Sequence, residues 1–342
     1  MSIILDAMGS DHYPIPEIEG AIAAAREFRE EIILVGNETQ ILPRLKEFNA
    51  ENLPLRVVHA PDVLEMTDKP VEGTRAKPNN SMAVGLKLLK NGEGSAFVTA
   101  GNTGGAMFNA TRILRRIEGV ERPALTAIFP TRKGQCVVCD IGANVDCRPE
   151  FLVQFAYMGS LYAEKILGVP SPRVGLLSNG EESMKGNALV HETHELLQQT
   201  PLNFIGNVEP KELFQGEVDL VITDGFTGNI LLKSSEAVAK LLVDILREEL
   251  RATPLRTLGA LLARPAFGKL RKMMSPEEVG AAPLLGVDGL VFIGHGRSNA
   301  RAIYSALRLA RQAVQLDLLG ALRQEIKLRL NSSSTEINPS LS

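Results

Sequence analysis

The sequence contains no tryptophan, and aromatic residues make up only 5% of its 342 residues. Proteins that bind single-stranded nucleic acid stack bases on aromatic side chains, so this scarcity disfavours that class. The chain also has no large excess of positive or negative charge. Its 37 lysines and arginines and 40 aspartates and glutamates give a net charge of −3. A general nucleic-acid binder carries a marked positive charge, and we therefore expect no nucleic-acid partner.

Cysteine and long apolar runs are scarce too. Three cysteines are too few for a disulfide framework and indicate a reducing compartment. No run approaches the roughly 18 apolar residues of a membrane-spanning helix. The short apolar run at the amino terminus lacks the basic region of a secretory signal. We expect a cytoplasmic protein that can still contact a membrane surface.

Two patterns resemble metal-binding motifs without completing one. Cys136 and Cys139 have Cys-x-x-Cys spacing, but in a continuous apolar strand their side chains point to opposite faces, and no second pair exists. His191 and His194 share a predicted helix face, but Glu195 stands where a His-Glu-x-x-His motif needs its second histidine. We expect core cysteines, a solvated histidine face, and no metal or other cofactor.

Short apolar runs alternate with helical patterns along most of the chain. This alternation is typical of a parallel sheet with crossover helices, so we predict an α/β fold with a mostly parallel sheet. Most runs are apolar on both faces, as buried parallel strands require. The predicted strands are residues 3–6, 32–35, 55–59, 96–100, 125–129, 136–140, 174–177, 203–205, 220–223 and 290–293.

The chain length fits one large or two modest domains. We expect a single catalytic domain over residues 1–330, with a helical insertion at about 234–280, and a serine-rich disordered tail at 331–342. Residues 62–80 are polar and contain prolines. A loop of this length is often a functional lid, and an ordinary surface excursion is the equal alternative.

Residues 252–274 contain no acidic residue, and basic side chains alternate there with apolar ones. The pattern is typical of a protruding basic amphipathic segment. It can meet an anionic membrane surface or form a helical pair packed on a dimer partner. The candidate contact residues are Arg256, Leu258, Leu261, Leu262, Arg264, Phe267 and Lys269.

Turns rich in glycine and asparagine follow three predicted strands, at residues 101–105, 141–144 and 224–229. Carboxyl ends of parallel strands lie along one edge of a sheet, so we expect these turns to line one crevice. Glycine admits a ligand close to the backbone, and free N–H groups at helix starts suit phosphate, although glycine at such corners often serves packing alone. No dinucleotide or nucleoside-triphosphate motif is present, which favours a small anion.

Two further polar segments follow predicted strands. Lys185, in the segment 178–187, can pair with phosphate or polarise a carbonyl, although a charged loop that caps the next helix is the commoner explanation. His295 lies between two glycines and is a candidate acid, base or anion donor. Cys147 has no evident base beside it that would make it a nucleophile.

Six motifs, in the same order along the chain, resemble those of the bacterial acyl-carrier-protein:phosphate acyltransferases. They are DAMGSDH at 6–12, AGNTG at 100–104, DIGANVDC at 140–147, GEE at 180–182 with KGN at 185–187, DGFTGN at 224–229 and HG at 295–296. The resemblance extends from Met1 to about Leu319. It departs at Ser10, where many members have glycine, and at Arg297, where serine is common, which could alter anion affinity.

The resemblance implies a three-layer α/β/α fold like that of isocitrate and isopropylmalate dehydrogenases, in a cytoplasmic homodimer that associates peripherally with the membrane. The family transfers a long-chain fatty acyl group from acyl carrier protein to inorganic phosphate, giving acyl phosphate for phospholipid synthesis. The implied partners therefore include acyl carrier protein and a downstream glycerol-3-phosphate acyltransferase. The carrier protein is acidic, so the basic segment 252–274 could also steer it.

Phosphate is itself the nucleophile in this reaction, so the protein mainly orients it and stabilises the tetrahedral oxyanion. We expect the start of the helix after Asn102 to hold phosphate, Lys185 and Asn229 to stabilise developing charge, and Asp224 to orient one of these two. The expected catalytic residues are Lys185, Asn229, Asp224 and His295, and the expected binding residues are Gly101, Asn102, Thr103, Gly104, Asn144, Asn179, Gly228 and His12.

Three rival functions fit parts of the sequence. A phosphotransacetylase would act on a short acyl-coenzyme A, and donor preference separates it from the first hypothesis. A decarboxylating dehydrogenase is disfavoured because neither a nicotinamide fingerprint nor an acidic metal cluster is evident. A non-catalytic membrane scaffold would have no need of the polar turns.

Overall fold

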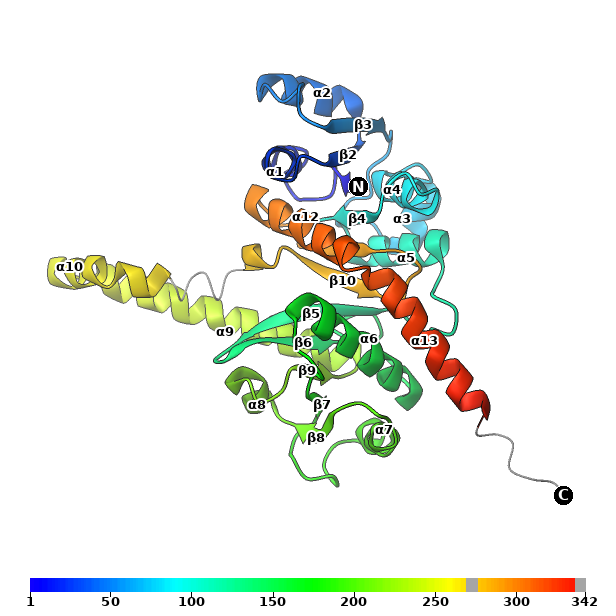
Figure 1. Cartoon of the computed structure of the whole chain (residues 1–342). Coiled ribbons are helices and arrows are strands. Elements are labelled where there is room, and N and C mark those ends of the chain that lie inside the picture. The colour runs from blue at the N-terminus through cyan, green and yellow to red at the C-terminus, as the bar shows by residue number, and fades with distance from the viewer. Residues whose placement is uncertain (269–275, 336–342) are drawn as a thin grey trace.

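A computed structural model describes the backbone of residues 1–268 and 276–335 and the side chains of residues 1–268 and 277–328. One sheet of 11 strands lies between two layers of helices, which confirms the predicted three-layer α/β/α fold (Figure 1). The strands are β1 Ser2–Asp6, β2 Glu31–Gly36, β3 Leu55–His59, β4 Ala96–Thr99, β5 Ala124–Thr131, β6 Gly134–Cys139, β7 Val174–Leu177, β8 Phe204–Val208, β9 Leu220–Ile222, β10 Ala281–Leu285 and β11 Val291–Gly294.

The helices begin mostly at Asn, Asp or Pro, residues that favour a helix start. They are α1 Ile15–Phe28, α2 Glu38–Glu47, α3 Pro70–Ala76, α4 Ser81–Lys90, α5 Thr103–Leu114, α6 Pro149–Leu167, α7 Ala188–Gln198, α8 Pro210–Gln215, α9 Gly225–Arg251, α10 Pro254–Leu262, α12 Ala300–Gln315 and α13 Leu318–Thr335, with a short 3-10 turn at Pro276–Glu278.

The strand order is β3-β2-β1-β4-β11-β10-β5-β6-β9-β7-β8. Neighbouring strands are parallel at both ends of this order, from β3 to β11 and from β6 to β8. In the middle, β10 is antiparallel to β11 and to β5, and β5 is antiparallel to β6. These three successive antiparallel pairings reverse the strand direction between the two parallel parts of the sheet. As a result β6, β9, β7 and β8 run opposite to β1, β2, β3, β4 and β11.

Two apolar cores lie on the two faces of the sheet. Cys139 belongs to the core beneath α1, α6 and α12, and Cys136 belongs to the core beneath α4 and α5. Both side chains are fully buried, which confirms the prediction of core cysteines on opposite faces.

Several boundaries differ from those predicted. Strand β10 was not predicted, the polar stretch 62–80 contains α3, and the protruding helices begin with α9 at Gly225 rather than near 234. Helix α13 continues to Thr335, because each further residue adds one hydrogen bond to a helix that already exists, so the expected tail is helical over 331–335. Residues 336–342 lie outside the described residues.

Candidate functional site

The predicted polar turns form two groups. The first turn group comprises residues 7–13, 100–105 and 295–298, which follow β1, β4 and β11. The second turn group comprises residues 140–147, 178–187 and 224–229, which follow β6, β7 and β9. Because the strands of the two groups run in opposite directions, strand direction alone does not bring the turns at 101–105, 141–144 and 224–229 to one edge of the sheet, and their sharing of one crevice stays a prediction. Among the described residues, no hydrogen bond joins one group to the other.

A buried aspartate at the end of β1 organises the first turn group. The Thr99 hydroxyl donates to Asp6 Oδ2 over 2.7 Å, and its oxygen accepts the Gly101 N–H over 3.0 Å. The Met8 N–H donates to Asp6 Oδ1 over 3.1 Å. Burial raises the pKa of Asp6, and the hydrogen bond from Thr99 opposes that rise. This network fixes where the turn after β4 begins.

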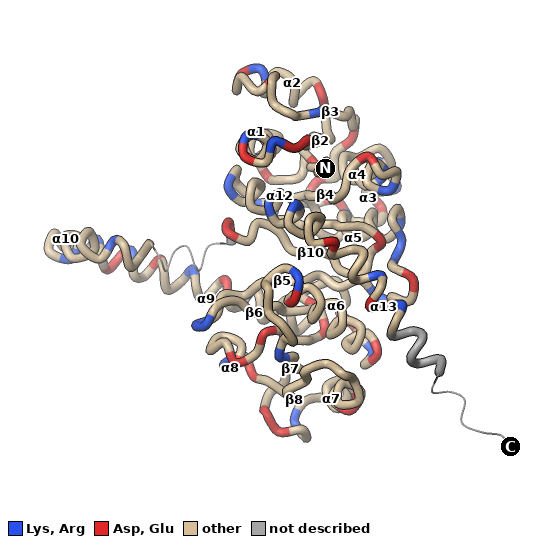
Figure 2. Tube along the Cα trace, viewed as in Figure 1, with Lys and Arg blue, Asp and Glu red and all other residues tan. Residues whose placement is uncertain are grey.

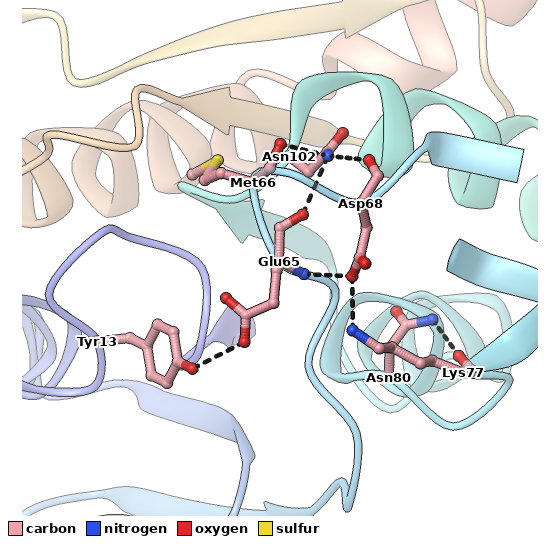
Figure 3. A network of polar contacts seen from close by, with 7 residues as sticks. All are labelled: Tyr13, Glu65, Met66, Asp68, Lys77, Asn80 and Asn102. Carbon is pink, nitrogen blue, oxygen red and sulfur yellow. Dashed lines mark hydrogen bonds and ion pairs between the residues drawn. The ribbon is translucent and has the colours of Figure 1, made fainter. Parts of the chain in front are cut away.

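Asn102, expected to hold phosphate, has its carboxamide fully engaged within the chain (Figure 3). Its Oδ1 accepts the Gly105 N–H over 2.9 Å and so caps α5. Its Nδ2 lies 3.2 Å from the carbonyl oxygens of Glu65 and Met66 and 2.9 Å from that of Asp68. The side chain therefore binds the segment that we call the 62–69 loop, which lies over the start of α5.

The glycines at the start of α5 admit that same loop. A Cβ on Gly104 would lie 2.5 Å from Pro70 Cγ, and one on Gly105 would lie 2.1 Å from Leu64 Cδ2. At these two positions glycine therefore serves the packing of the loop and not the approach of a ligand. The N–H groups of Thr103 and Gly104 have no described hydrogen bond, as expected in the first turn of a helix, and they remain possible anion donors.

The turn after β11 completes the first turn group. The Asp11 N–H donates to the Gly296 carbonyl over 2.7 Å. His295 Nδ1 accepts the Arg297 N–H over 3.1 Å, so the neutral ring carries its proton on Nε2. Both His295 and His12 are exposed. His295 can thus offer one fixed N–H donor to a ligand.

Asp140 organises the second turn group with more hydrogen bonds than Asp6 accepts. Its Oδ1 accepts the N–H groups of Leu125, Gly142 and Ala143 over 3.0, 3.1 and 3.0 Å. Its Oδ2 accepts the backbone and side-chain N–H groups of Asn144 over 2.7 and 2.9 Å. Burial raises the pKa of Asp140, and these bonds oppose the rise. The Asn144 side chain, expected in the binding site, is thus a support of its own turn.

The start of α9 is packed onto the Asp140 turn. A Cβ on Gly228 would lie 1.9 Å from the Asp140 carbonyl oxygen, so only glycine allows this approach. Asp224 accepts the N–H and hydroxyl groups of Thr227, both over 2.8 Å. It therefore caps α9 and has no described bond to Lys185 or Asn229, one of which it was expected to orient.

Lys185, Asn179 and Asn229 are the expected site residues of the second turn group whose side chains remain free. None of the three side chains has a described hydrogen bond or ion pair within the part of the chain that the structure covers. Asn229 lies beside the Asp140 turn, with its Cβ 3.8 Å from the place of a Cβ on Gly142. Free amide and ammonium groups can reorient toward a substrate, which makes this turn group the better candidate for chemistry.

Asn207, on β8, supports the loop that carries Lys185. Its Nδ2 donates to the Glu182 carbonyl over 2.9 Å, and its Oδ1 lies 3.0 Å from His194 Nδ1. His194 Nε2 lies 3.0 Å from Gln198 Nε2. The expected solvated histidine face is therefore wrong for His194, which is buried because α7 turns it onto β8. Sequence patterns gave no signal for Asn207.

Large apolar side chains are exposed on the segments of the second turn group. They are Val145, Met184, Phe226 and, one turn further along α9, Ile230, with relative exposures of 60%, 78%, 57% and 50%. Exposed apolar side chains next to free polar groups are typical of sites for substrates with both kinds of surface.

The cysteines are poor nucleophiles. Burial first, and the charge of Asp140 second, raise the pKa of Cys147 to about 12. Burial likewise raises the pKa values of Cys136 and Cys139. Because the thiolate is the reactive form, none of the three is prepared for covalent catalysis.

One group of carboxylates has the spacing of a metal site. Glu181, Glu209 and Glu212 have oxygens within 4.8 Å of one another. Lys211 Nζ lies 2.7 Å from Glu181 and Glu209 and 3.4 Å from Glu212. The lysine ammonium thus supplies the positive charge at this position, and its hydrogen bond lowers the pKa of Glu181.

Helices α9 and α10 protrude from the body of the molecule (Figure 1). In α10 no residue is buried, and its exposed leucines include Leu258, Leu261 and Leu262. Arg256 pairs with Glu249 of α9. Figure 2 shows charged residues of both signs along these two helices.

The expected contact residues that follow α10 are not all exposed or described. Arg264 is exposed, Phe267 is half-buried, and Lys269 lies outside the described residues. Within the described chain, no helix combines the length and the apolar character needed to cross a membrane.

Comparison with known proteins shows what the whole chain resembles. Residues 1–320 match the family model described as "Fatty acid synthesis protein". A phosphate acyltransferase of Pelotomaculum thermopropionicum is 45% identical over 327 residues, which cover 96% of this chain and 95% of that protein. One of Geotalea uraniireducens is 45% identical over 315 residues, covering 92% and 91% of the two chains.

Solved structures with a similar fold are more distant in sequence. A phosphotransacetylase from Streptococcus pyogenes has a TM-score of 0.60 at 16% identity, covering 92% of this chain and 94% of that one. A 4-hydroxythreonine-4-phosphate dehydrogenase from Klebsiella pneumoniae has a TM-score of 0.51 at 13% identity, covering 92% and 98%. At these identities the likeness concerns the fold alone. The family match and the full-length relatives, by contrast, establish that the chain belongs to the phosphate acyltransferase family.

Proposed function

We propose that this protein transfers a long-chain fatty acyl group from the thioester of acyl carrier protein to inorganic phosphate, giving acyl phosphate and the free carrier thiol. The observation that carries the proposal is the full-length match to phosphate acyltransferases. The absence of a prepared cysteine nucleophile agrees with it. Phosphate brings its own nucleophilic oxygen, so no covalent enzyme intermediate is required.

The second turn group supplies the proposed contacts to the reacting acyl group. Lys185 and Asn229 have free donors that can stabilise the negative charge of the tetrahedral intermediate. The exposed apolar side chains of Met184 and Phe226 suit a substrate that carries a fatty acyl chain. The departing thiol has a pKa near 8.5 and leaves without a strong acid.

The first turn group supplies the proposed phosphate contacts. The proposal requires the two turn groups to face one crevice, because the phosphate oxygen must attack the acyl carbonyl carbon directly. The N–H groups of Thr103 and Gly104 and the Nε2–H of His295 are its donors, while His12 is a weaker candidate. Asn102 is not retained as a phosphate ligand, since its donors and its acceptor are already engaged.

The deciding experiment measures thiol release from long-chain acyl carrier protein by the purified protein, with and without inorganic phosphate. The same long-chain acyl group on coenzyme A serves as the comparison donor. We expect release that depends on phosphate and is faster from the carrier protein. Release from coenzyme A alone would favour a phosphotransacetylase activity, and release from neither donor would overturn the proposal.

We further propose that α10 brings the protein to anionic membranes. Exposed leucines can enter the lipid interface, while Arg264 and the other basic side chains of the segment meet the head groups. The test is co-sedimentation with phosphatidylglycerol-containing vesicles. Leu261→Glu with Leu262→Glu should abolish co-sedimentation, whereas Leu42→Glu, at an exposed site on α2, should not. Normal co-sedimentation of the double variant would contradict this proposal and favour the carrier protein or a dimer partner.

A homodimer is part of the proposed assembly. Leu241, Leu242 and Ile245 are exposed on α9, and neighbouring exposed apolar side chains of this kind are typical of protein–protein contacts. Light scattering should give twice the mass of the chain, and a monomer at micromolar concentration would contradict the proposal. The acyl phosphate product is a reactive anhydride, which supports a downstream acyltransferase that consumes it on glycerol 3-phosphate.

A further inference from the structure

The 62–69 loop is hydrogen-bonded to the start of α5 through a single side chain. Asn102 Nδ2 donates to the carbonyl oxygens of Glu65, Met66 and Asp68, which lie 3.2, 3.2 and 2.9 Å from it (Figure 3). Asn102 is only 8% exposed. The carbonyl groups of Met66 and Asp68 have no other described donor, whereas that of Glu65 also accepts the Asp68 N–H over 3.1 Å. This carboxamide therefore ties three carbonyl groups of the loop to the start of α5.

Other contacts tie the same loop to the neighbouring turns. The Tyr13 hydroxyl, from the turn after β1, donates to Glu65 Oε1 over 3.1 Å. Asp68 Oδ2 accepts the Glu65 N–H over 2.8 Å and the Lys77 ammonium over 2.6 Å. The Lys77 hydrogen bond lowers the pKa of Asp68. These bonds connect the loop with the turn after β1, with the residue that follows α3 and with itself.

The loop also reaches the turn after β11. A Cβ on Gly296 would lie 2.6 Å from Met66 Cε and 2.8 Å from Asp11 Oδ1. The 62–69 loop thus contacts all three turns of the first turn group. A loop in that position forms one wall beside the free N–H groups of Thr103 and Gly104.

We propose that Asn102 is a positioning residue, which holds the 62–69 loop as a wall of the phosphate site and does not itself bind phosphate. This inference rests on the proposed function for the identity of the ligand. It explains why an asparagine, which combines one acceptor for the helix cap with donors for the loop, stands at this position. Loss of the donors alone should open the wall and weaken phosphate binding.

Two substitutions of Asn102 remove its Nδ2 donors but keep an acceptor that can cap α5. Asn102→Asp keeps an acceptor for α5 but turns a carboxylate oxygen toward three carbonyl oxygens. Asn102→Ser keeps a milder cap without charge, in case the aspartate variant fails to fold. The matched control is Asn37→Asp on α2, where Oδ1 likewise caps a helix by accepting the Thr39 N–H over 3.0 Å.

The first measurement is amide hydrogen exchange of residues 62–69 with and without inorganic phosphate. In the wild type and in Asn37→Asp we expect slow exchange that phosphate slows further. In both Asn102 variants exchange should be faster and protection by phosphate lost. Unchanged exchange in the Asn102 variants would overturn the positioning role.

The second measurement is steady-state thiol release with phosphate varied. We expect the Asn102 variants to raise the KM for phosphate at least about tenfold while kcat falls less than about threefold, as for the loss of a binding interaction. An unchanged KM together with an open loop would overturn the inference and leave the proposed function intact. A wild type without phosphate-dependent release would instead overturn the proposed function, while protection of the loop by phosphate alone would still support the wall.

Discussion

The two turn groups are built alike and differ in what they leave free. Each begins with a buried aspartate at the end of a strand, Asp6 in the first turn group and Asp140 in the second. In the first, the polar side chain best placed for a ligand, Asn102, holds a loop of the same chain. In the second, Lys185 and Asn229 have no described partner. Supporting groups are engaged within the fold, whereas groups for chemistry must remain available to the substrate.

The largest expected effect comes from replacing the buried aspartate that holds each turn group together. Asp140→Ala removes five hydrogen bonds at once and leaves several partly buried N–H groups without an acceptor. We expect it to lower the free energy of unfolding by about 4 kcal/mol, and Asp6→Ala, which removes fewer bonds, by about 2 kcal/mol. Urea unfolding of both variants checks this order. Equal losses would show that the number of bonds does not distinguish the two groups.

A second support, in the first turn group, gives a pH-dependent effect. Glu17 of α1 is buried and accepts the Ser10 N–H over 2.7 Å. Burial raises its pKa from 4.5 to about 7, so the folded state binds a proton more tightly than the unfolded state. Stability associated with this group is therefore present below pH 4.5 and is lost as the pH rises to 7.

Glu17→Gln should remove this pH dependence, because the amide can accept the Ser10 N–H without carrying charge. Relative to the variant, the wild type should lose on the order of 3 kcal/mol of unfolding free energy between pH 4.5 and pH 7.5. Urea unfolding across that range measures the difference, and Glu19→Gln, at an exposed site on the same helix, is the control. Parallel curves for wild type and Glu17→Gln would contradict the shifted pKa.

The fold was predictable because its strands are short apolar runs, and ten of the eleven appear in the sequence at nearly the observed positions. Strand β10 was missed because its sequence, AAPLL, combines alanine and proline, which have low strand propensity. Its neighbours β11 and β5 determine its conformation. The reversal of strand direction at β10 and β5 was also not predictable, since a buried antiparallel strand and a buried parallel strand present the same apolar run.

The candidate site was predictable to the level of segments and not of side chains. The motifs located the turns of both turn groups, because strand-to-helix turns need glycine and capping residues. Which side chains are engaged depends on distant partners, such as the 62–69 loop for Asn102 and β8 for the Lys185 loop. Glu17 is an acidic residue in the first turn of α1, a position that is commonly exposed, and only the tertiary structure shows it buried.

Lys185→Ala tests whether the free ammonium group of the second turn group takes part in catalysis. Its ammonium is exposed and unpaired in the described structure, so its loss should change the free energy of unfolding by less than about 0.5 kcal/mol. If it stabilises the oxyanion, kcat/KM for thiol release should fall about a hundredfold, equivalent to about 2.7 kcal/mol. Lys46→Ala, at an exposed site on α2, is the matched control. Unchanged turnover would remove Lys185 from the mechanism.

The smallest expected effect comes from the outer tether of the 62–69 loop. Tyr13→Phe deletes one hydroxyl, and with it the 3.1 Å bond to Glu65, at a solvent-accessible place. Burial and the Glu65 charge raise the pKa of Tyr13, so the hydroxyl stays protonated and the bond persists at ordinary pH. Because Asn102 still holds the loop, we expect the KM for phosphate to rise less than about threefold and stability to change by less than about 1 kcal/mol. A KM effect as large as that of Asn102→Asp would mean that the loop is held from its outer edge, and Asn102 would then be one support among several.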